Sequence, residues 1–208
     1  MNNVPRQFCL LLLSLTSLNA SAQSAFDQQI AAHREQYKAE FLSTKSSPLQ
    51  SQEAVSLLRF YPPDSMYRVT ATVQLTPRMA PVDLPTSMAT RTATEAPYAT
   101  LSFTIDGKPC QLTVYRSLSL ANNPLYRDYL FLPFTDATSG KETYGGGRYL
   151  DLRTRQIQNG KLMLDFNKAY NPYCAYKSGY ACPIPPAANR LAVPIKAGEL
   201  TYGGAHQD

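Results

Sequence analysis

The chain has 208 residues, of which 44% are hydrophobic and 17% charged, and this balance excludes an intrinsically disordered protein. Its length is sufficient for one hydrophobic core, so we expect a single globular domain over residues 23–204, followed by a flexible tail at 205–208. The net charge of +5 comes from basic residues scattered along the chain, which argues against nucleic acid as a partner.

The first 22 residues have the pattern of a secretory signal peptide. Arg6 precedes a short apolar run at 8–18, and Ala20-Ser21-Ala22 is a small-x-small cleavage site. The apolar run is too short to span a bilayer as a mature helix, and Cys9 lies at its start instead of its end, which does not fit a lipoprotein anchor. We therefore predict an exported protein, periplasmic or secreted, with no transmembrane segment in the mature chain. Cleavage removes one arginine and no acid, which lowers the net charge to +4.

Two helices are predicted at the start of the mature chain. In residues 26–42, four apolar side chains fall near one face of a helix. A second helix is predicted to begin at Ser47-Pro48-Leu49-Gln50, with Ser47 as its N-cap, and to end before Tyr61-Pro62-Pro63-Asp64. The apolar positions of the first helix are Phe26, Ile30, Tyr37 and Phe41.

The pattern then changes to the alternation of strands. Residues 69–75 alternate apolar and polar side chains, and residues 77–97 are rich in Pro, Thr and Met, which favours a loop. Asp106-Gly107 lies between two further alternating stretches, 101–105 and 112–114. We expect a hairpin there, because Asp-Gly suits a turn that needs positive φ.

Further strands are expected in the second half of the chain. Residues 129–134 predict one, and 149–152 and 162–166 flank Asn159-Gly160, which predicts a second hairpin. A last edge strand is expected at 191–195, because Pro194 cannot donate to a ladder. The fold class that follows is mostly β: an antiparallel sandwich or barrel with one or two N-terminal helices and an irregular Pro/Tyr-rich C-terminal segment.

Several motifs resemble a bacterial and archaeal family called domain of unknown function 1684. The resemblance covers roughly residues 41–199, and the family name implies no activity. The stretches that carry it are 47–49, 61–64, 142–151, 165–167, 169–176, 182–186, Asn189 and 197–199.

The run Tyr144-Gly145-Gly146-Gly147-Arg148 allows two interpretations. Backbone N–H groups and the Arg148 guanidinium could form a cradle for a carboxylate or phosphate. Alternatively, the glycines allow a tight crossing where a strand turns a corner. The run lacks the Lys-Ser/Thr of a P-loop and its strand-to-helix context, so we favour the crossing.

Acidic residues near these motifs are candidates for hydrolysis by two carboxylates, and Glu142, Asp151 and Asp165 are the candidate catalytic residues. The alternative is that they form structural ion pairs, with Arg148 and Asp165 as the first pair expected. The only histidines are His33 and His206, which supports neither a histidine-based triad nor a zinc site. We expect no metal and no cofactor.

Cys174 and Cys182 are the expected disulfide, which would stabilise the fold by about 2–3 kcal/mol in the loop-entropy model. A reduced, packed pair is the alternative. Cys110 lies in a strand-like alternation and is expected to be buried.

These patterns predict an exported, non-enzymatic domain that binds a small ligand or a cell-envelope component. The alternatives are a carboxylate-based hydrolase and a structural envelope factor. The predicted ligand-binding residues are Tyr144, Gly145, Gly146, Gly147, Arg148, Asp165, Asn167, Tyr170, Asn171 and Tyr176.

Overall fold

The computed structural model describes residues 7–77 and 79–208, with side chains described from Ala25 onward. Two α-helices precede a series of strands, and short 3-10 turns connect them. The elements are α1 (Gln7–Ser43), α2 (Gln52–Ser56), β1 (Arg68–Leu75), β2 (Val82–Pro85), β3 (Thr92–Ile105), β4 (Lys108–Ser117), β5 (Tyr129–Phe134), β6 (Arg148–Arg153) and β7 (Lys161–Asp165).

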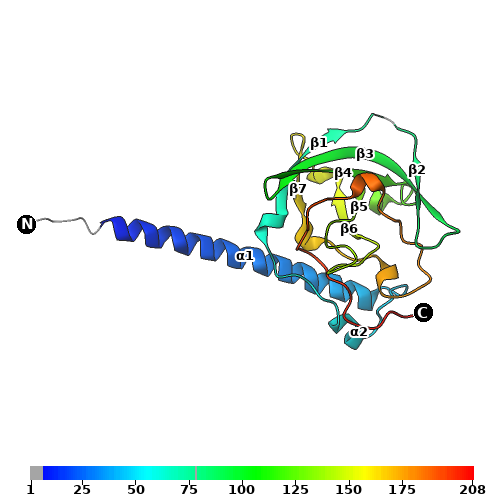
Figure 1. The fold of residues 1–208 in the computed structure, drawn as a ribbon, viewed down its shortest axis with the longest axis horizontal. Helices are drawn as coiled ribbons and strands as arrows, with labels where there is room; N and C mark the ends of the chain where they lie inside the picture. Colours follow the sequence, from blue (N-terminus) through cyan, green and yellow to red (C-terminus); the bar gives the residue numbers. More distant parts are fainter. Residues whose placement is uncertain (1–6, 78) are drawn as a thin grey trace, which may run out of the picture.

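The strands form one antiparallel sheet in the order β6-β5-β4-β3-β1-β7, with β2 added to β3. Figure 1 shows the sheet curving into a half-barrel with α1 at its side. The predicted mostly β, antiparallel architecture with N-terminal helices is therefore confirmed.

The main core lies on the concave face of the half-barrel, where alternate residues of each strand meet. Leu101 and Phe103 of β3, Leu132 of β5 and Leu164 of β7 are typical members. The C-terminal segment closes this core without forming a strand.

The predicted edge strand at 191–195 is wrong. Its alternate residues Leu191, Val193 and Ile195 do point into the core, which explains the strand-like pattern. However, the backbone N–H of Ile195 donates to the Asp136 carboxylate at 3.1 Å instead of to a neighbouring strand. An isolated bridge joins Thr135 to Arg190, and single backbone hydrogen bonds join Leu191 to Thr135 and Ala137 to Val193, without forming a ladder.

The two Xaa-Gly turns have different outcomes. Asp106-Gly107 joins β3 to β4, with φ of 47° and 70°, so the first hairpin is confirmed. Asn159-Gly160 also turns with positive φ, 51° and 70°, but β6 and β7 do not pair with each other. β6 pairs with β5 and β7 with β1, so the predicted pairing of the flanking strands is wrong. The turn itself is closed by an antiparallel bridge between Gln158 and Lys161. A 3-10 turn at Thr154–Gln156 redirects the chain between β6 and β7.

Two local predictions also need correction. The segment 77–97 is not only a loop, because it contains β2 and the first residues of β3. The second helix begins later than predicted: Ser51 is its N-cap and accepts from the N–H of Ala54 at 3.1 Å. The hydroxyl of Ser47 accepts from the N–H of Leu49 instead, in a turn before the helix.

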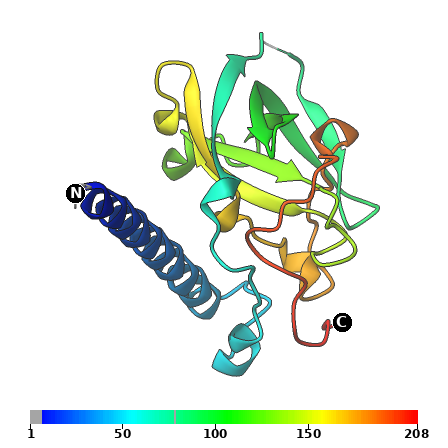
Figure 2. The ribbon, with the colours of Figure 1, turned by 60° about the vertical axis from the view of Figure 1, so that its left-hand side comes forward.

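Helix α1 packs along one side of the sheet, and residues 26–42 are helical as predicted (Figure 2). Phe26, Ile30 and Phe41 are buried. Arg68 of β1 donates to Gln29 at 2.8 Å, and its guanidinium carbon lies 4.4 Å from the centroid of the Phe26 ring. These contacts fix the second half of the helix against the sheet.

The predicted signal peptide occupies residues 1–22. Residues 1–6 lie outside the described part of the chain, and residues 7–22 belong to the start of α1, which extends away from the sheet in Figure 1. Export therefore stays a prediction. Within residues 7–77 and 79–208, no helix combines the length and the apolarity that a membrane span requires.

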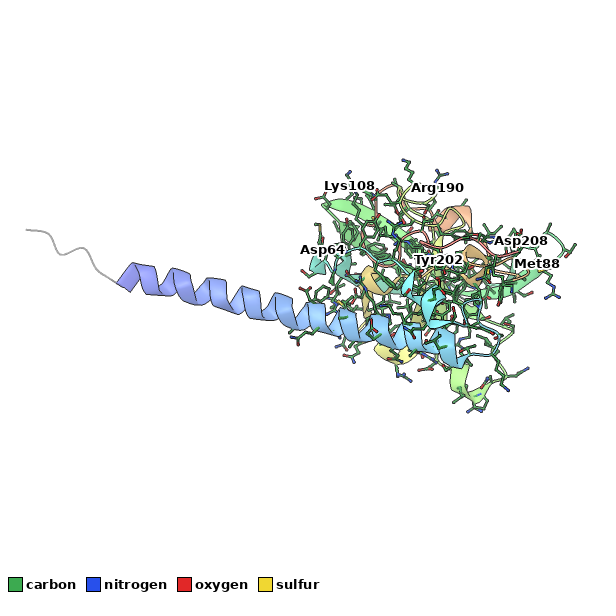
Figure 3. All side chains as sticks on the ribbon, turned by 90° about the horizontal axis from the view of Figure 1, so that it is seen from below. Asp64, Met88, Lys108, Arg190, Tyr202 and Asp208 are labelled. Carbon is green, nitrogen blue, oxygen red and sulfur yellow. The ribbon has the colours of Figure 1, made fainter. Side chains whose placement is uncertain are left out.

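A second, smaller core joins the helices to the C-terminal segment. It contains Phe41 of α1, Val55 of α2, Tyr176 and Tyr202. Tyr202 lies beside α2 in Figure 3, and its hydroxyl donates to the carbonyl of Ala54 at 2.9 Å.

Candidate functional site

The glycine run lies in the loop that leads from β5 into β6. Gly147 has a φ of +89°, and its N–H donates to the carbonyl of Tyr144 at 3.1 Å. A Cβ atom at Gly147 would lie 2.7 Å from both the Phe134 carbonyl oxygen and Cγ of Pro185. The backbone is thus approached closely by protein atoms, which agrees with the interpretation of the run as a tight crossing.

Arg148 is fully buried and holds the C-terminal segment to the sheet. Its guanidinium donates to the carbonyls of Ile195, Ala197 and Glu199, and to the Asp136 carboxylate at 2.9 Å. The expected pair between Arg148 and Asp165 is wrong. Asp165 pairs with Arg68 instead, at 2.7 Å. No part of the Arg148 guanidinium is left to face a ligand.

Three other predicted binding residues also hold the protein together. The Asn167 side chain accepts from the N–H of Asp64 at 2.9 Å and donates to its carbonyl at 2.8 Å. The Tyr176 hydroxyl and the backbone N–H of Asn171 both donate to the side chain of Glu199, and the Asn171 side chain donates to the carbonyl of Leu200 at 2.8 Å. All three are buried, so their polar groups are directed at the protein itself.

Glu199 is a fully buried carboxylate at the junction of α1 and the C-terminal segment. It accepts from the hydroxyls of Tyr37 at 3.0 Å and Tyr176 at 2.7 Å, and from the N–H of Asn171 at 2.9 Å. Burial raises its pKa to about 7, although these three donors oppose the shift.

We expect the free energy of unfolding to fall as the pH rises from about 4.5 to about 7. Because the pKa of Glu199 is raised in the folded state, the folded protein binds a proton that the unfolded chain has released, and this stabilisation is lost as Glu199 ionises. The loss is on the order of 3 kcal/mol. Urea denaturation at about pH 5 and about pH 7.5 measures it.

The variant Glu199→Gln should reduce this pH dependence, whereas Glu142→Gln, which changes an exposed carboxylate, should not. Glu95 should account for a remainder, since burial also raises its pKa to about 7. His33 acts in the opposite direction, because burial lowers its pKa. An unchanged pH dependence in Glu199→Gln would contradict the assignment.

A pocket of about 700 Å³ lies between α1 and β6. Six tyrosines line it: Tyr37 of α1, and Tyr126, Tyr149, Tyr170, Tyr173 and Tyr180 of the C-terminal half of the chain. Of the ten predicted binding residues, only Asp165 and Tyr170 are in its wall. The complete lining is His33, Gln36, Tyr37, Glu40, Tyr126, Tyr149, Leu150, Asp151, Leu152, Gln156, Met163, Asp165, Lys168, Tyr170, Pro172, Tyr173, Tyr180, Ala181, Cys182 and Pro183.

Asp151 of β6 is an exposed carboxylate in this pocket, and its hydrogen bonds within the protein go to one of its two oxygens. The hydroxyls of Tyr129 and Tyr170 donate to Oδ1 at 2.8 Å and 2.7 Å, and no hydrogen bond within the described residues reaches Oδ2. The carboxylate is accessible, yet the protein atoms around it exclude enough water to raise its pKa. No ion pair joins it to a cationic side chain among the described residues.

The wall of the pocket also carries His33, Lys168 and Asp165. Burial and the nearby Lys168 lower the pKa of His33, which keeps the imidazole neutral near pH 7. Asp165 is neutralised by Arg68. The third candidate acid, Glu142, lies outside the pocket and accepts from Tyr61 at 2.8 Å.

Cys174 and Cys182 are free thiols in the structure, so the predicted disulfide is not formed there. The two side chains are adjacent: the N–H of Cys174 donates to Sγ of Cys182 at 3.2 Å, and a hydrogen bond between the thiols lowers the pKa of Cys174 to about 6. Cys182 also lines the pocket. Cys110 is half-buried, which is less than expected.

The sequence pointed to Asp151 and to several of the tyrosines, but not to the pocket that joins them. Its other wall comes from α1, through His33, Gln36 and Glu40. These residues show no motif, and only the packing of α1 against the sheet brings them near β6.

Comparisons with known proteins agree with the fold but name no activity. The family model described as "Protein of unknown function (DUF1684)" matches residues 54–200. The chain is also similar to an uncharacterised protein of Haloarcula marismortui with a solution NMR structure. The two are 34% identical with a TM-score of 0.65, over 87% of this chain and 97% of the other. No curated protein matches the chain.

Proposed function

Because the chain belongs to the DUF1684 family, whose description gives no activity, we propose from the pocket itself that the protein binds a small organic ligand between α1 and β6. The proposal includes export, since residues 1–22 have the pattern of a signal peptide. The ligand is then a small molecule or an envelope component met outside the cytoplasm.

The observation that carries the proposal is the open carboxylate oxygen of Asp151 in a pocket lined by tyrosine rings. Small-molecule sites have volumes of roughly 300–1,000 Å³ and combine aromatic walls with a few directed polar groups. The buried carboxylate of Glu199 has both oxygens engaged by protein donors. Asp151 is exposed, and its Oδ2 is open to solvent and therefore to a ligand in the pocket.

A thermal-shift screen of a diverse small-molecule collection tests the proposal. We expect a subset of compounds to raise the melting temperature of the protein, because binding to the folded state alone stabilises it. Gln36→Trp should abolish these shifts, since an indole at this exposed pocket position fills the space.

Gln28→Trp is the matched control for that experiment. Gln28 is an exposed residue of the same helix and does not line the pocket, so its replacement should leave the shifts intact. Compounds that stabilise both tryptophan variants equally would place the binding elsewhere and contradict the proposal.

A carboxylate-based hydrolase is the second candidate function. Asp151, Asp165 and Glu40 line one pocket, and the raised pKa of Asp151 suits a general acid. The ion pair between Asp165 and Arg68 weakens this candidate, because it commits the second carboxylate. Conversion of a bound compound by the wild-type protein, but not by Asp151→Asn, would favour hydrolysis over binding alone.

A further inference from the structure

We propose that the ligand is an organic amine, bound as its cation, with the ammonium group at Oδ2 of Asp151 and its apolar part against the tyrosine rings. This inference rests on the proposed function and assigns the ligand its chemical class. Three independent features of the pocket lead to it.

The first feature is the direction of the hydrogen bonds. A tyrosine hydroxyl has one proton to donate, and both Tyr129 and Tyr170 give theirs to Oδ1 of Asp151. What remains around Asp151 are acceptors: the Oδ2 atom and the lone pairs of the two phenol oxygens. A ligand completes this arrangement only if it brings hydrogen-bond donors, and an ammonium group brings up to three.

The second feature is the arrangement of the aromatic rings. Tyr170 lies edge-on to Tyr149, with ring centroids 5.9 Å apart and an interplanar angle of 88°, and it also lies 5.9 Å from Tyr37. Tyr173 and Tyr180 form a second inclined pair at 5.3 Å. Rings at such angles direct their electron-rich faces in several directions, and those faces attract organic cations.

The third feature is the balance of charge. The positive charge of Arg153 is near enough to lower the pKa of Asp151. However, Arg153 forms an ion pair with Asp128 at 2.9 Å, and its guanidinium carbon lies 5.5 Å from the centroid of the Tyr129 ring. Of the other charged residues that line the pocket, Asp165 is paired with Arg68, and Glu40 and Lys168 carry opposite charges. A cationic ligand would therefore supply a counterion for Asp151, whereas an anionic ligand would be repelled by the Asp151 carboxylate.

The test compares benzylamine with benzyl alcohol, which have the same ring but differ in charge. Dissociation constants are measured by ligand-observed NMR at neutral pH for the wild-type protein, Asp151→Asn and Glu142→Gln. We expect the wild-type protein to bind the amine at least about tenfold more tightly, a difference of about 1.4 kcal/mol. The preference should vanish in Asp151→Asn and persist in Glu142→Gln, which removes an equal charge outside the pocket.

Equal binding of the two probes, tighter binding of the alcohol, or a preference that survives in Asp151→Asn would overturn the inference. If Asp151→Asn fails to fold, Tyr129→Phe replaces it. This variant removes one of the two donors to Oδ1, while Tyr170 still donates to that atom, so amine binding should hold or strengthen. Equal weakening for both probes would count against the inference. If the thermal-shift screen yields only neutral or anionic ligands of this pocket, the binding function stands and the amine assignment fails.

Discussion

Replacing Arg148 with methionine should lower the free energy of unfolding by about 3–5 kcal/mol, which is enough to unfold many proteins of this size. The change leaves the buried carboxylate of Asp136 without its cation and removes donors from the carbonyls of Ile195, Ala197 and Glu199. Each buried acceptor left without a donor adds a cost. The midpoint of urea denaturation measures the loss.

Two variants show whether the buried position causes this effect. Arg68→Met breaks the ion pair with Asp165, in which the arginine side chain is 25% exposed, and should cost less than Arg148→Met, because water can replace part of the lost interaction. Arg148→Lys keeps the charge but loses the planar fork of donors, so its stability should lie between the wild type and Arg148→Met. If Arg148→Met were as stable as Arg68→Met, the Arg148 guanidinium would not be what holds the C-terminal segment to the sheet.

Arg148 also supports the wall of the pocket, through a short series of contacts. Arg148 binds the backbone of Glu199, and the Glu199 carboxylate binds the hydroxyl of Tyr37 on α1. α1 in turn forms one wall of the pocket. A residue with no exposed surface therefore positions the site without touching a ligand, so loss of binding in an Arg148 variant has to be separated from loss of folding.

Strands and turns were predictable because their signals are local. Alternation identified β1 and parts of β3 and β4, and Asp106-Gly107 identified a hairpin. Pairing was less predictable, as the second Xaa-Gly turn shows. Asn159-Gly160 adopts the predicted conformation, yet its flanking strands lie at opposite ends of the sheet order. The chemistry of a turn determines its backbone angles, whereas partners along the sheet depend on contacts distant in sequence.

The candidate site was predictable only in part, for the same reason. Asp151 was among three candidate acids, but its partners Tyr129 and Tyr170 and the wall from α1 follow from packing. Arg148 was assigned to a ligand because an arginine after glycines suits an anion cradle. Nothing local in the sequence indicated that Asp136 and three carbonyls would enclose it.

Replacing Gly147 with alanine should cost about 2–5 kcal/mol, the second large effect that we expect. A φ of +89° strains any residue with a Cβ atom. The new methyl group would also lie 2.7 Å from the Phe134 carbonyl oxygen and 3.1 Å from Cγ2 of Thr135, so the crossing has to open. Thermal and urea denaturation measure the loss.

Gly145→Ala provides the matched control within the same run of glycines. Gly145 does not have a positive φ, and a Cβ atom there would come no closer than 3.5 Å to Gly140, so we expect a change within about 0.5 kcal/mol. A much larger loss of stability in Gly147→Ala than in Gly145→Ala means that Gly147 is needed for the tight crossing of the chain. If both variants kept their stability and both lost the ligand-induced shifts, the glycines would act as a backbone cradle for the ligand, and the crossing interpretation would be wrong.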